Sequence, residues 1–237
     1  MSLSLIPNAD KKHHEVWHPD SDLASFPCPS RIVLCAKPNG GKTTVVLNLL
    51  LKANPPYKKI FLMHPSLRAT GDTETDDDDV DEYSEEVPEY KHVDFSPLYD
   101  FPNPKFFDND CKKQDLLIDD IELKTLTKEQ KKRFNKILSY SSTHYNLTVV
   151  LTSQDIFTQL PVCALRFCNV FFLWRYSDLN YQRMILNRMG ISKKTIEKVL
   201  DEMSGYGVHD FLTVDTTLDT PQKFRKNLYV PLKHLET

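Results

Sequence analysis

The sequence predicts a single α/β domain with a mostly parallel β-sheet and helices on both of its faces. Short, almost continuously apolar runs alternate with amphipathic segments along the chain. Strands of that kind are buried on both sides, as they are in parallel sheets covered by helices. We find no internal repeat, and 237 residues can form one sizeable core. The expected organisation is an extended, proline-broken lead-in at 1–30, the domain at 31–232 and a short tail at 233–237.

The expected strands are rich in β-branched and aliphatic residues and end at a turn or at polar residues. They cover 31–36, 58–64, 114–120, 147–154, 169–175, 209–215 and 227–232.

The expected helices follow from capping residues and from the spacing of apolar residues. Thr127, with Gln130 three positions later, begins a helix that runs to about residue 142. Asp178 and Ser192 begin two more, at about 178–189 and 192–203, and Gly190 separates them. A further helix is expected at 45–53, directly after the first strand.

Composition excludes several classes of protein. No apolar run approaches the ~20 residues that span a bilayer, and the first residues lack the apolar core of a secretory signal. We therefore expect an intracellular protein without a membrane partner. The five cysteines form no C-x-x-C pair, which argues against a zinc site and against a disulfide framework.

The net charge of -3 hides an asymmetry. Residues 72–89 contain 11 acidic side chains and no Lys or Arg, so the rest of the chain carries 30 basic and 22 acidic side chains. We expect the acidic segment, at about 70–90, to form a flexible surface loop because its charges repel one another. The basic remainder suits a polyanionic partner.

Residues 36–43, AKPNGGKT, have the spacing of a phosphate-binding P-loop, with Ala36 where Gly is more common. Gly40 and Gly41 let backbone N–H groups converge on phosphate oxygens at a helix N-terminus. Lys42 would reach the β- and γ-phosphates, and the Thr43 hydroxyl would bind Mg²⁺. The pattern predicts a single P-loop NTPase domain with ATP and Mg²⁺ as cofactors. The expected nucleotide contacts are Lys37, Pro38, Asn39, Gly40, Gly41, Lys42, Thr43 and Thr44.

Polar residues end two of the later strands, where open parallel sheets hold their ligands. Asp119 closes the run 116–119 and is the expected second ligand of the metal. Asp120 is the expected catalytic residue that polarises the attacking water, and Glu122 is a weaker candidate for that role. Gln154 would sense the γ-phosphate or orient water, and its structural alternative is a turn or cap for the segment that follows.

Other P-loop classes fit less well. The chain has no N/T-K-x-D motif for reading guanine and no Arg-rich lid of a nucleotide kinase. The carboxylate pair with a Gln one strand later favours ATPases that act on polymers. Such enzymes use an arginine from a neighbouring subunit. Arg133, Arg166 and Arg175 are candidates, and the sequence does not choose among them.

From about Arg31 to Leu232 the chain resembles the viral genome-packaging ATPases of the FtsK–HerA superfamily, found in poxviruses, virophages and Polinton-type elements. Three segments carry the resemblance: LLIDDIE at 116–122, the series His144, Gln154, Pro161 and Arg166, and 209–225 with its Asp-ended strand, Thr-Pro turn and basic residues.

The resemblance implies an ATP-driven motor that moves double-stranded DNA into a capsid. It also implies a homo-oligomeric ring (pentamer or hexamer), capsid or portal-like vertex proteins as partners, and a location in the virus factory or nucleus of the infected host or in the virion. Gln154 would be the sensor. Many relatives carry Arg where Thr143 stands, which favours Arg166 as the transferred arginine. Two basic helix faces could contact DNA: Lys128, Lys131, Lys132, Arg133 and Lys136, and Lys193, Lys194 and Lys198.

Two alternatives remain open at this point. One is a helicase or conjugation-type DNA pump of the same superfamily, and the other is a nucleotide-dependent adaptor that does not hydrolyse ATP.

Overall fold

The computed structural model describes residues 29–51, 57–65, 94–107, 114–218, 223–232 and 235. The expected lead-in except for its last two residues, the acidic segment at 70–90, the Thr-Pro turn at 220–221 and nearly all of the expected tail lie outside these residues.

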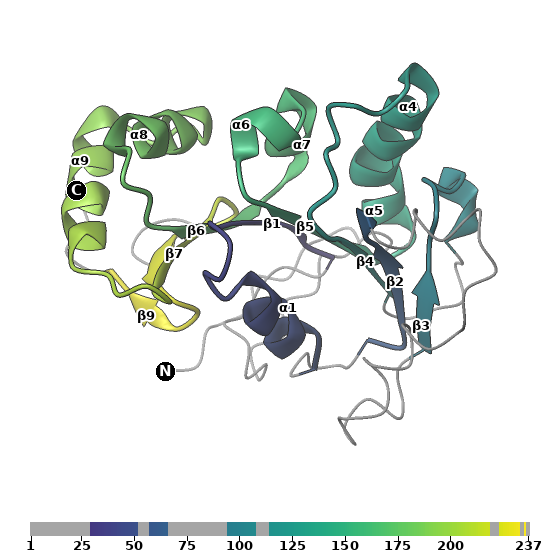
Figure 1. The fold of residues 1–237 in the computed structure, drawn as a ribbon, viewed down its shortest axis with the longest axis horizontal. Coiled ribbons are helices and arrows are strands. Elements are labelled where there is room, and N and C mark those ends of the chain that lie inside the picture. Colours follow the sequence, from purple (N-terminus) through teal and green to yellow (C-terminus); the bar gives the residue numbers. More distant parts are fainter. Residues whose placement is uncertain are drawn as a thin grey trace, which may run out of the picture.

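One sheet runs through the described part of the chain, with the strand order β3-β2-β4-β5-β1-β6-β7-β8-β9 (Figure 1). From β3 to β6 neighbouring strands are parallel, and from β6 to β9 they are antiparallel. The expectation of a mostly parallel sheet is confirmed. The strands are β1 (Arg31–Cys35), β2 (Lys59–Met63), β3 (Asp94–Pro97), β4 (Gln114–Ile118), β5 (Leu147–Ser153), β6 (Val170–Trp174), β7 (Phe211–Asp215), β8 (Phe224–Lys226) and β9 (Val230–Pro231).

Helices cover both faces of the sheet (Figure 1). Along β1, Ile32 and Leu34 pack with α1 on one face, whereas Val33 and Cys35 belong to the larger core on the other. The alternation follows from the period of two in a strand. The helices are α1 (Lys42–Leu51), η3 (Pro104–Phe106), α4 (Lys128–Lys136), η4 (Ile137–Ser141), α5 (Ser142–His144), α6 (Ile156–Gln159), α7 (Val162–Phe167), α8 (Leu179–Arg188) and α9 (Lys193–Ser204).

The expected helix starts at Thr127, Asp178 and Ser192 are confirmed. Thr127 and Gln130 form a reciprocal capping box, and the side chains of Asp178 and Ser192 accept hydrogen bonds from backbone N–H groups of α8 and α9. None of the described helices is long and apolar enough to cross a membrane.

Three expectations about elements need correction, and several short elements were not expected. The strand expected at 227–232 is only the pair Val230–Pro231, because Asn227 has φ of 53° and turns the chain back after β8. The helix expected at 45–53 already begins at Lys42. The helix expected to run to residue 142 changes to a π-helical turn at 137–141. β3, β8, α6 and α7 were not expected, because β3, β8 and α6 have only three or four residues and the six residues of α7 make fewer than two helical turns.

Candidate nucleotide site

The phosphate loop connects β1 to α1 at the carboxyl edge of the sheet, where β4 and β5 also end (Figure 1). Two of its residues adopt left-handed conformations, Asn39 with φ of 60° and Gly41 with φ of 95°. A Cβ atom at Gly40 would lie 2.9 Å from the Ala36 Cβ. Gly40 therefore leaves the space that the Ala36 methyl needs, which accounts for Ala at a position where P-loops more often carry Gly.

Lys42 lies inside this loop and is 8% exposed. Its Nζ donates to the Ala36 carbonyl at 3.0 Å and lies 3.9 Å from Asp120 Oδ2. The ammonium thus sits between the start of the phosphate loop and the carboxylates that follow β4. Thr43 and Thr44 follow in the first turn of α1 and are exposed, as are Lys37, Pro38 and Asn39.

Thr152 of β5 joins the Asp119 carboxylate to the backbone of Asp120. Its hydroxyl donates to Asp119 Oδ1 and accepts a hydrogen bond from the Asp120 N–H at 2.9 Å. Asp120 has φ of 48°, a strained conformation for a residue with a side chain, and the Thr152 contact holds it there. The sequence pattern pointed to the polar run 152–154 but not to this bridge.

Gln154 also reaches this cluster. Its Nε2 donates to Asp120 Oδ2 at 3.1 Å. Its backbone N–H donates to Gln159 Oε1 at 2.7 Å, and its carbonyl accepts from the Tyr176 hydroxyl at 2.6 Å. The structure therefore brings Lys42, Asp119, Asp120 and Gln154 together.

The cluster fits a nucleotide with Mg²⁺. Asp120 Oδ1 is buried and has no hydrogen-bond partner among the described residues, and the side chains of Asp119 and Asp120 are 26% and 29% exposed. Mg²⁺ takes oxygen ligands and usually only one or two from protein side chains, with water and phosphate completing the shell. Thr43 and Asp119 carry side-chain oxygens of that kind, and the expectation that they bind the metal stays a prediction. The described residues contain no group of three or more His, Cys, Asp or Glu side chains placed to hold a metal.

Of the three candidate arginines, Arg166 lies away from this cluster. Arg166 is exposed near the end of α7, and the next residue, Phe167, accepts a hydrogen bond from Arg31 Nε at 2.6 Å. Arg31 begins β1, so Arg166 lies at the amino edge of the sheet, and a five-residue strand spans roughly 16 Å. Arg133 donates to the Phe101 carbonyl and Arg175 to the Ser204 carbonyl.

Glu122, the weaker candidate for activating water, is exposed in the turn after β4. Three further residues beside the site were not found from the sequence. The ideal Cβ position of Gly40 is 3.6 Å from Trp174 Cδ1, and that of Gly41 is 3.6 Å from His209 Nδ1. His64 Nε2 lies 4.0 Å from Asp119 Oδ2. His64 follows β2, Trp174 ends β6 and His209 precedes the antiparallel β7, so only the order and direction of the strands bring them here.

The fold is that of a P-loop NTPase, and the loop, the lysine and the strand-end carboxylates occupy one edge of its sheet. No protein-family model and no curated protein matches this sequence.

Solved structures do match. The genome packaging NTPase B204 from Sulfolobus turreted icosahedral virus 2, in complex with AMPPCP, is similar with a TM-score of 0.53 and 15% identity over 84% of this chain and 97% of that chain. B204, the DNA-packaging ATPase from Sulfolobus turreted icosahedral virus, gives a TM-score of 0.51 and 14% identity over 82% and 95%. At this identity the likeness is one of fold. On that level, the expected resemblance to viral genome-packaging ATPases is confirmed.

Proposed function

We propose that this protein is an ATP-hydrolysing motor that moves double-stranded viral DNA into a capsid. The observation that supports it best is the cluster of Lys42, Asp119, Asp120 and Gln154 at the carboxyl edge of the sheet. The similarity in fold to B204, which is described as a DNA-packaging ATPase, supports DNA as the polymer that the motor moves.

In the proposed site, Lys42 contacts the β- and γ-phosphates, and Thr43 and Asp119 bind Mg²⁺. Bound Mg²⁺ offsets the negative charge of the phosphates and makes the γ-phosphorus a better target for water. Asp120 Oδ2 is already contacted by Gln154 at 3.1 Å and faces Lys42 at 3.9 Å, whereas Oδ1 has no partner among the described residues. The Asp120 carboxylate, whose side chain is 29% exposed, would orient the attacking water and accept its proton.

A second copy of the chain is part of the proposal. Arg166 lies at the opposite edge of the sheet from its own phosphate loop, so it cannot contact the nucleotide of the same subunit. In a ring of five or six subunits, an exposed arginine at that edge can reach the γ-phosphate of a neighbour and stabilise its charge. Capsid or portal-like vertex proteins would then anchor the ring, in the virus factory or nucleus of the host cell.

DNA would contact lysines on α4 and α9, which lie on the same side of the sheet (Figure 1). Contacts to phosphates carry no sequence information, which suits a motor that must pass any sequence. Arg133 contributes less than expected because it already faces Asp100 and Glu129. The remaining lysines are exposed or half-buried: Lys128, Lys131, Lys132 and Lys136 on α4, and Lys193, Lys194 and Lys198 on α9.

The test is the rate of ATP hydrolysis with and without blunt duplex DNA, read together with the particle mass in solution. We expect stimulation by duplex DNA, loss of that stimulation as salt increases, and a ring-sized species. The Lys42→Ala variant is the control that removes nucleotide binding. A monomer that ignores DNA at low salt would rule out the motor. Unwinding of forked substrates would instead identify a helicase.

A further inference from the structure

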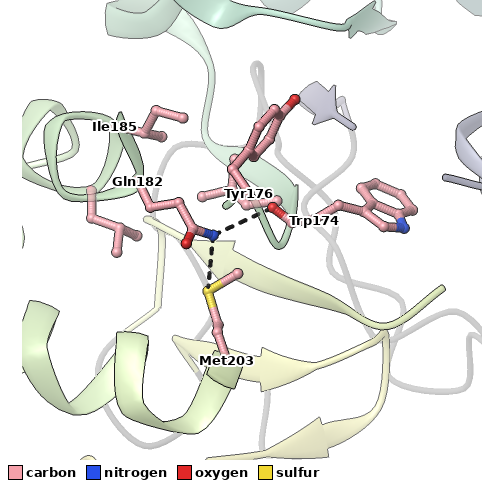
Figure 2. Close-up of a pocket in the computed structure, with 7 residues that line it drawn as sticks. Trp174, Tyr176, Gln182, Ile185 and Met203 are labelled. Carbon is pink, nitrogen blue, oxygen red and sulfur yellow. Dashed lines mark hydrogen bonds between the residues drawn. The ribbon is translucent and has the colours of Figure 1, made fainter. Parts of the chain in front are cut away.

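Tyr176 stands between the nucleotide site and helix α8. It follows β6, and β5, β1 and β6 are neighbours whose carboxyl ends lie side by side. Figure 2 shows its ring pointing away from Met203, with the Gln182 amide next to the adjoining backbone. In the amide orientation that gives both groups a partner, the Gln182 NH₂ donates to the Tyr176 carbonyl and the Gln182 oxygen accepts from the Tyr176 N–H, each at 3.2 Å. The backbone of Tyr176 is thus anchored to α8.

The hydroxyl of Tyr176 fixes the turn that carries Gln154. It donates to the Gln154 carbonyl at 2.6 Å and lies 3.2 Å from Cys35 Sγ. Burial raises the pKa of the Tyr176 phenol and of the Cys35 thiol, so both groups keep their protons. Since the Tyr176 hydroxyl already donates its proton to the Gln154 carbonyl, the Cys35 thiol donates to the phenol oxygen. The hydrogen bonds therefore run in one direction, from β1 through Tyr176 to Gln154.

Gln154 is held from its other side as well. Gln159 Oε1 accepts from the Gln154 N–H at 2.7 Å and also from the Ser153 hydroxyl at 2.7 Å. With its N–H and C=O both bonded, Gln154 keeps only side-chain freedom, and its amide meets Asp120. Loss of either backbone contact would let the amide leave Asp120.

The ring of Tyr176 contacts the phosphate loop. Lys37 Nζ lies 5.8 Å from the ring centroid, within the range of a cation–π contact. The ring also packs against that of Tyr181, with 4.9 Å between the ring centroids. The Tyr181 hydroxyl donates to Asp155 and accepts from the Ile156 N–H, each at 2.9 Å. One pair of tyrosines thus joins the phosphate loop, the Gln154 turn, α6 and α8.

We propose that Tyr176 is a positioning residue for ATP hydrolysis: its hydroxyl holds Gln154 against Asp120, and its ring transmits the occupancy of the phosphate loop to the Gln154 turn. The inference rests on the proposed hydrolysis of ATP at this site. Within the described part of the chain, Tyr176 makes no hydrogen bond to Asp119, Asp120 or Lys42. It acts through Gln154.

The first test is Tyr176→Phe, which keeps the ring and removes the hydroxyl. We expect kcat to fall about tenfold while the dissociation constant for ATPγS stays within about twofold, because a small misplacement of a reacting group slows chemistry more than binding. Tyr206→Phe is the matched control, since the buried Tyr206 hydroxyl has no hydrogen-bond partner among the described residues. A Tyr176→Phe enzyme with unchanged kcat, or with kcat and affinity lowered together, would overturn the proposal.

The second test is independent of turnover. Hydrogen exchange of backbone amides in 152–160 is measured with and without ATPγS. We expect nucleotide to slow exchange in the wild type and in Tyr206→Phe, and to have little effect in Tyr176→Phe. Equal protection in all three proteins overturns the proposal. If the wild type hydrolyses no ATP, the proposed function fails, and the exchange result alone decides the role of Tyr176.

Discussion

Strands β4 and β7 both end an apolar run with aspartate, yet the two ends have different surroundings. Asp119 and Asp120, after β4, are about a quarter exposed and face Lys42, Thr152 and Gln154. Asp215, at the end of β7, is completely buried. It accepts hydrogen bonds from the Thr217 N–H at 3.0 Å and hydroxyl at 2.6 Å, and it lies 3.4 Å from Arg225 Nη2.

Strand direction explains the difference. β4 is parallel to β2 and β5, so its carboxyl end lies at the edge that holds the phosphate loop. β7 is antiparallel to β6, and Asp215 pairs with Val170 at the start of that strand, which places it at the opposite edge. Burial raises the pKa of Asp215 and lowers the pKa of Arg225. Asp119 and Asp120 are therefore suited to catalysis, whereas Asp215 and Arg225 hold the hairpin of β7 and β8 together.

The largest effect is expected from Asp120→Asn. An amide cannot accept a proton from water, so ATP turnover should fall by about 10³-fold. Because Asp120 is partly exposed, the free energy of unfolding should change by less than about 1 kcal/mol. Steady-state hydrolysis measures the change in turnover, and urea denaturation measures the change in the free energy of unfolding. Near-normal turnover would move the role to another group, with Glu122→Gln as the comparison.

Asp215→Ala should show the opposite pattern. It leaves the Arg225 guanidinium buried without its carboxylate, which lowers the free energy of unfolding by about 3 kcal/mol. Hydrolysis per folded molecule should be unchanged, because the hydrogen-bond and ion-pair partners of Asp215 are Thr217 and Arg225, which are not part of the nucleotide site. The matched control replaces both members, Asp215→Leu with Arg225→Met, and should regain most of the lost stability. Loss of turnover in a folded Asp215 variant would contradict a purely structural role for Asp215.

Thr152→Val tests the hydrogen bonds that hold Asp119 and Asp120 after β4. The change is nearly isosteric and removes the hydroxyl that joins Asp119 to the Asp120 backbone. We expect kcat to fall roughly tenfold, since the carboxylates lose their fixed position. Thr148→Val, at the start of the same strand, is the control and should leave kcat unchanged. If both variants behave alike, the bridge has no part in hydrolysis.

The smallest effect concerns Asp210, which precedes β7. Its ion pair with Lys226, 2.9 Å long, and its hydrogen bonds from Asn227 and Gly207 lower its pKa from 3.8 to about 2. A carboxyl with a lowered folded-state pKa stabilises the protein above its unfolded pKa and loses that contribution as pH falls through the folded one. Between pH 4 and pH 2 the wild type should therefore lose more stability than Asp210→Asn. Thermal unfolding measured across that pH range tests this difference, and an equal loss of stability in the two proteins would contradict it.

The local features of this protein follow from its sequence alone. The phosphate loop at 36–43, the caps at Thr127, Asp178 and Ser192, and most of the strand positions depend on neighbouring residues along the chain, because backbone conformation and capping act over a few residues. The alternation of strands and helices likewise determined the α/β class.

Which side chains meet depends on how the strands are arranged in the folded protein. That Thr152 bridges Asp119 and Asp120, that Tyr176 holds Gln154, and that Arg166 lies away from its own phosphate loop all depend on the order and direction of strands. Apolar runs look the same in parallel and antiparallel strands once both faces are buried. The physical reason is that strand pairing is set by contacts between segments far apart in the chain, which no local pattern encodes.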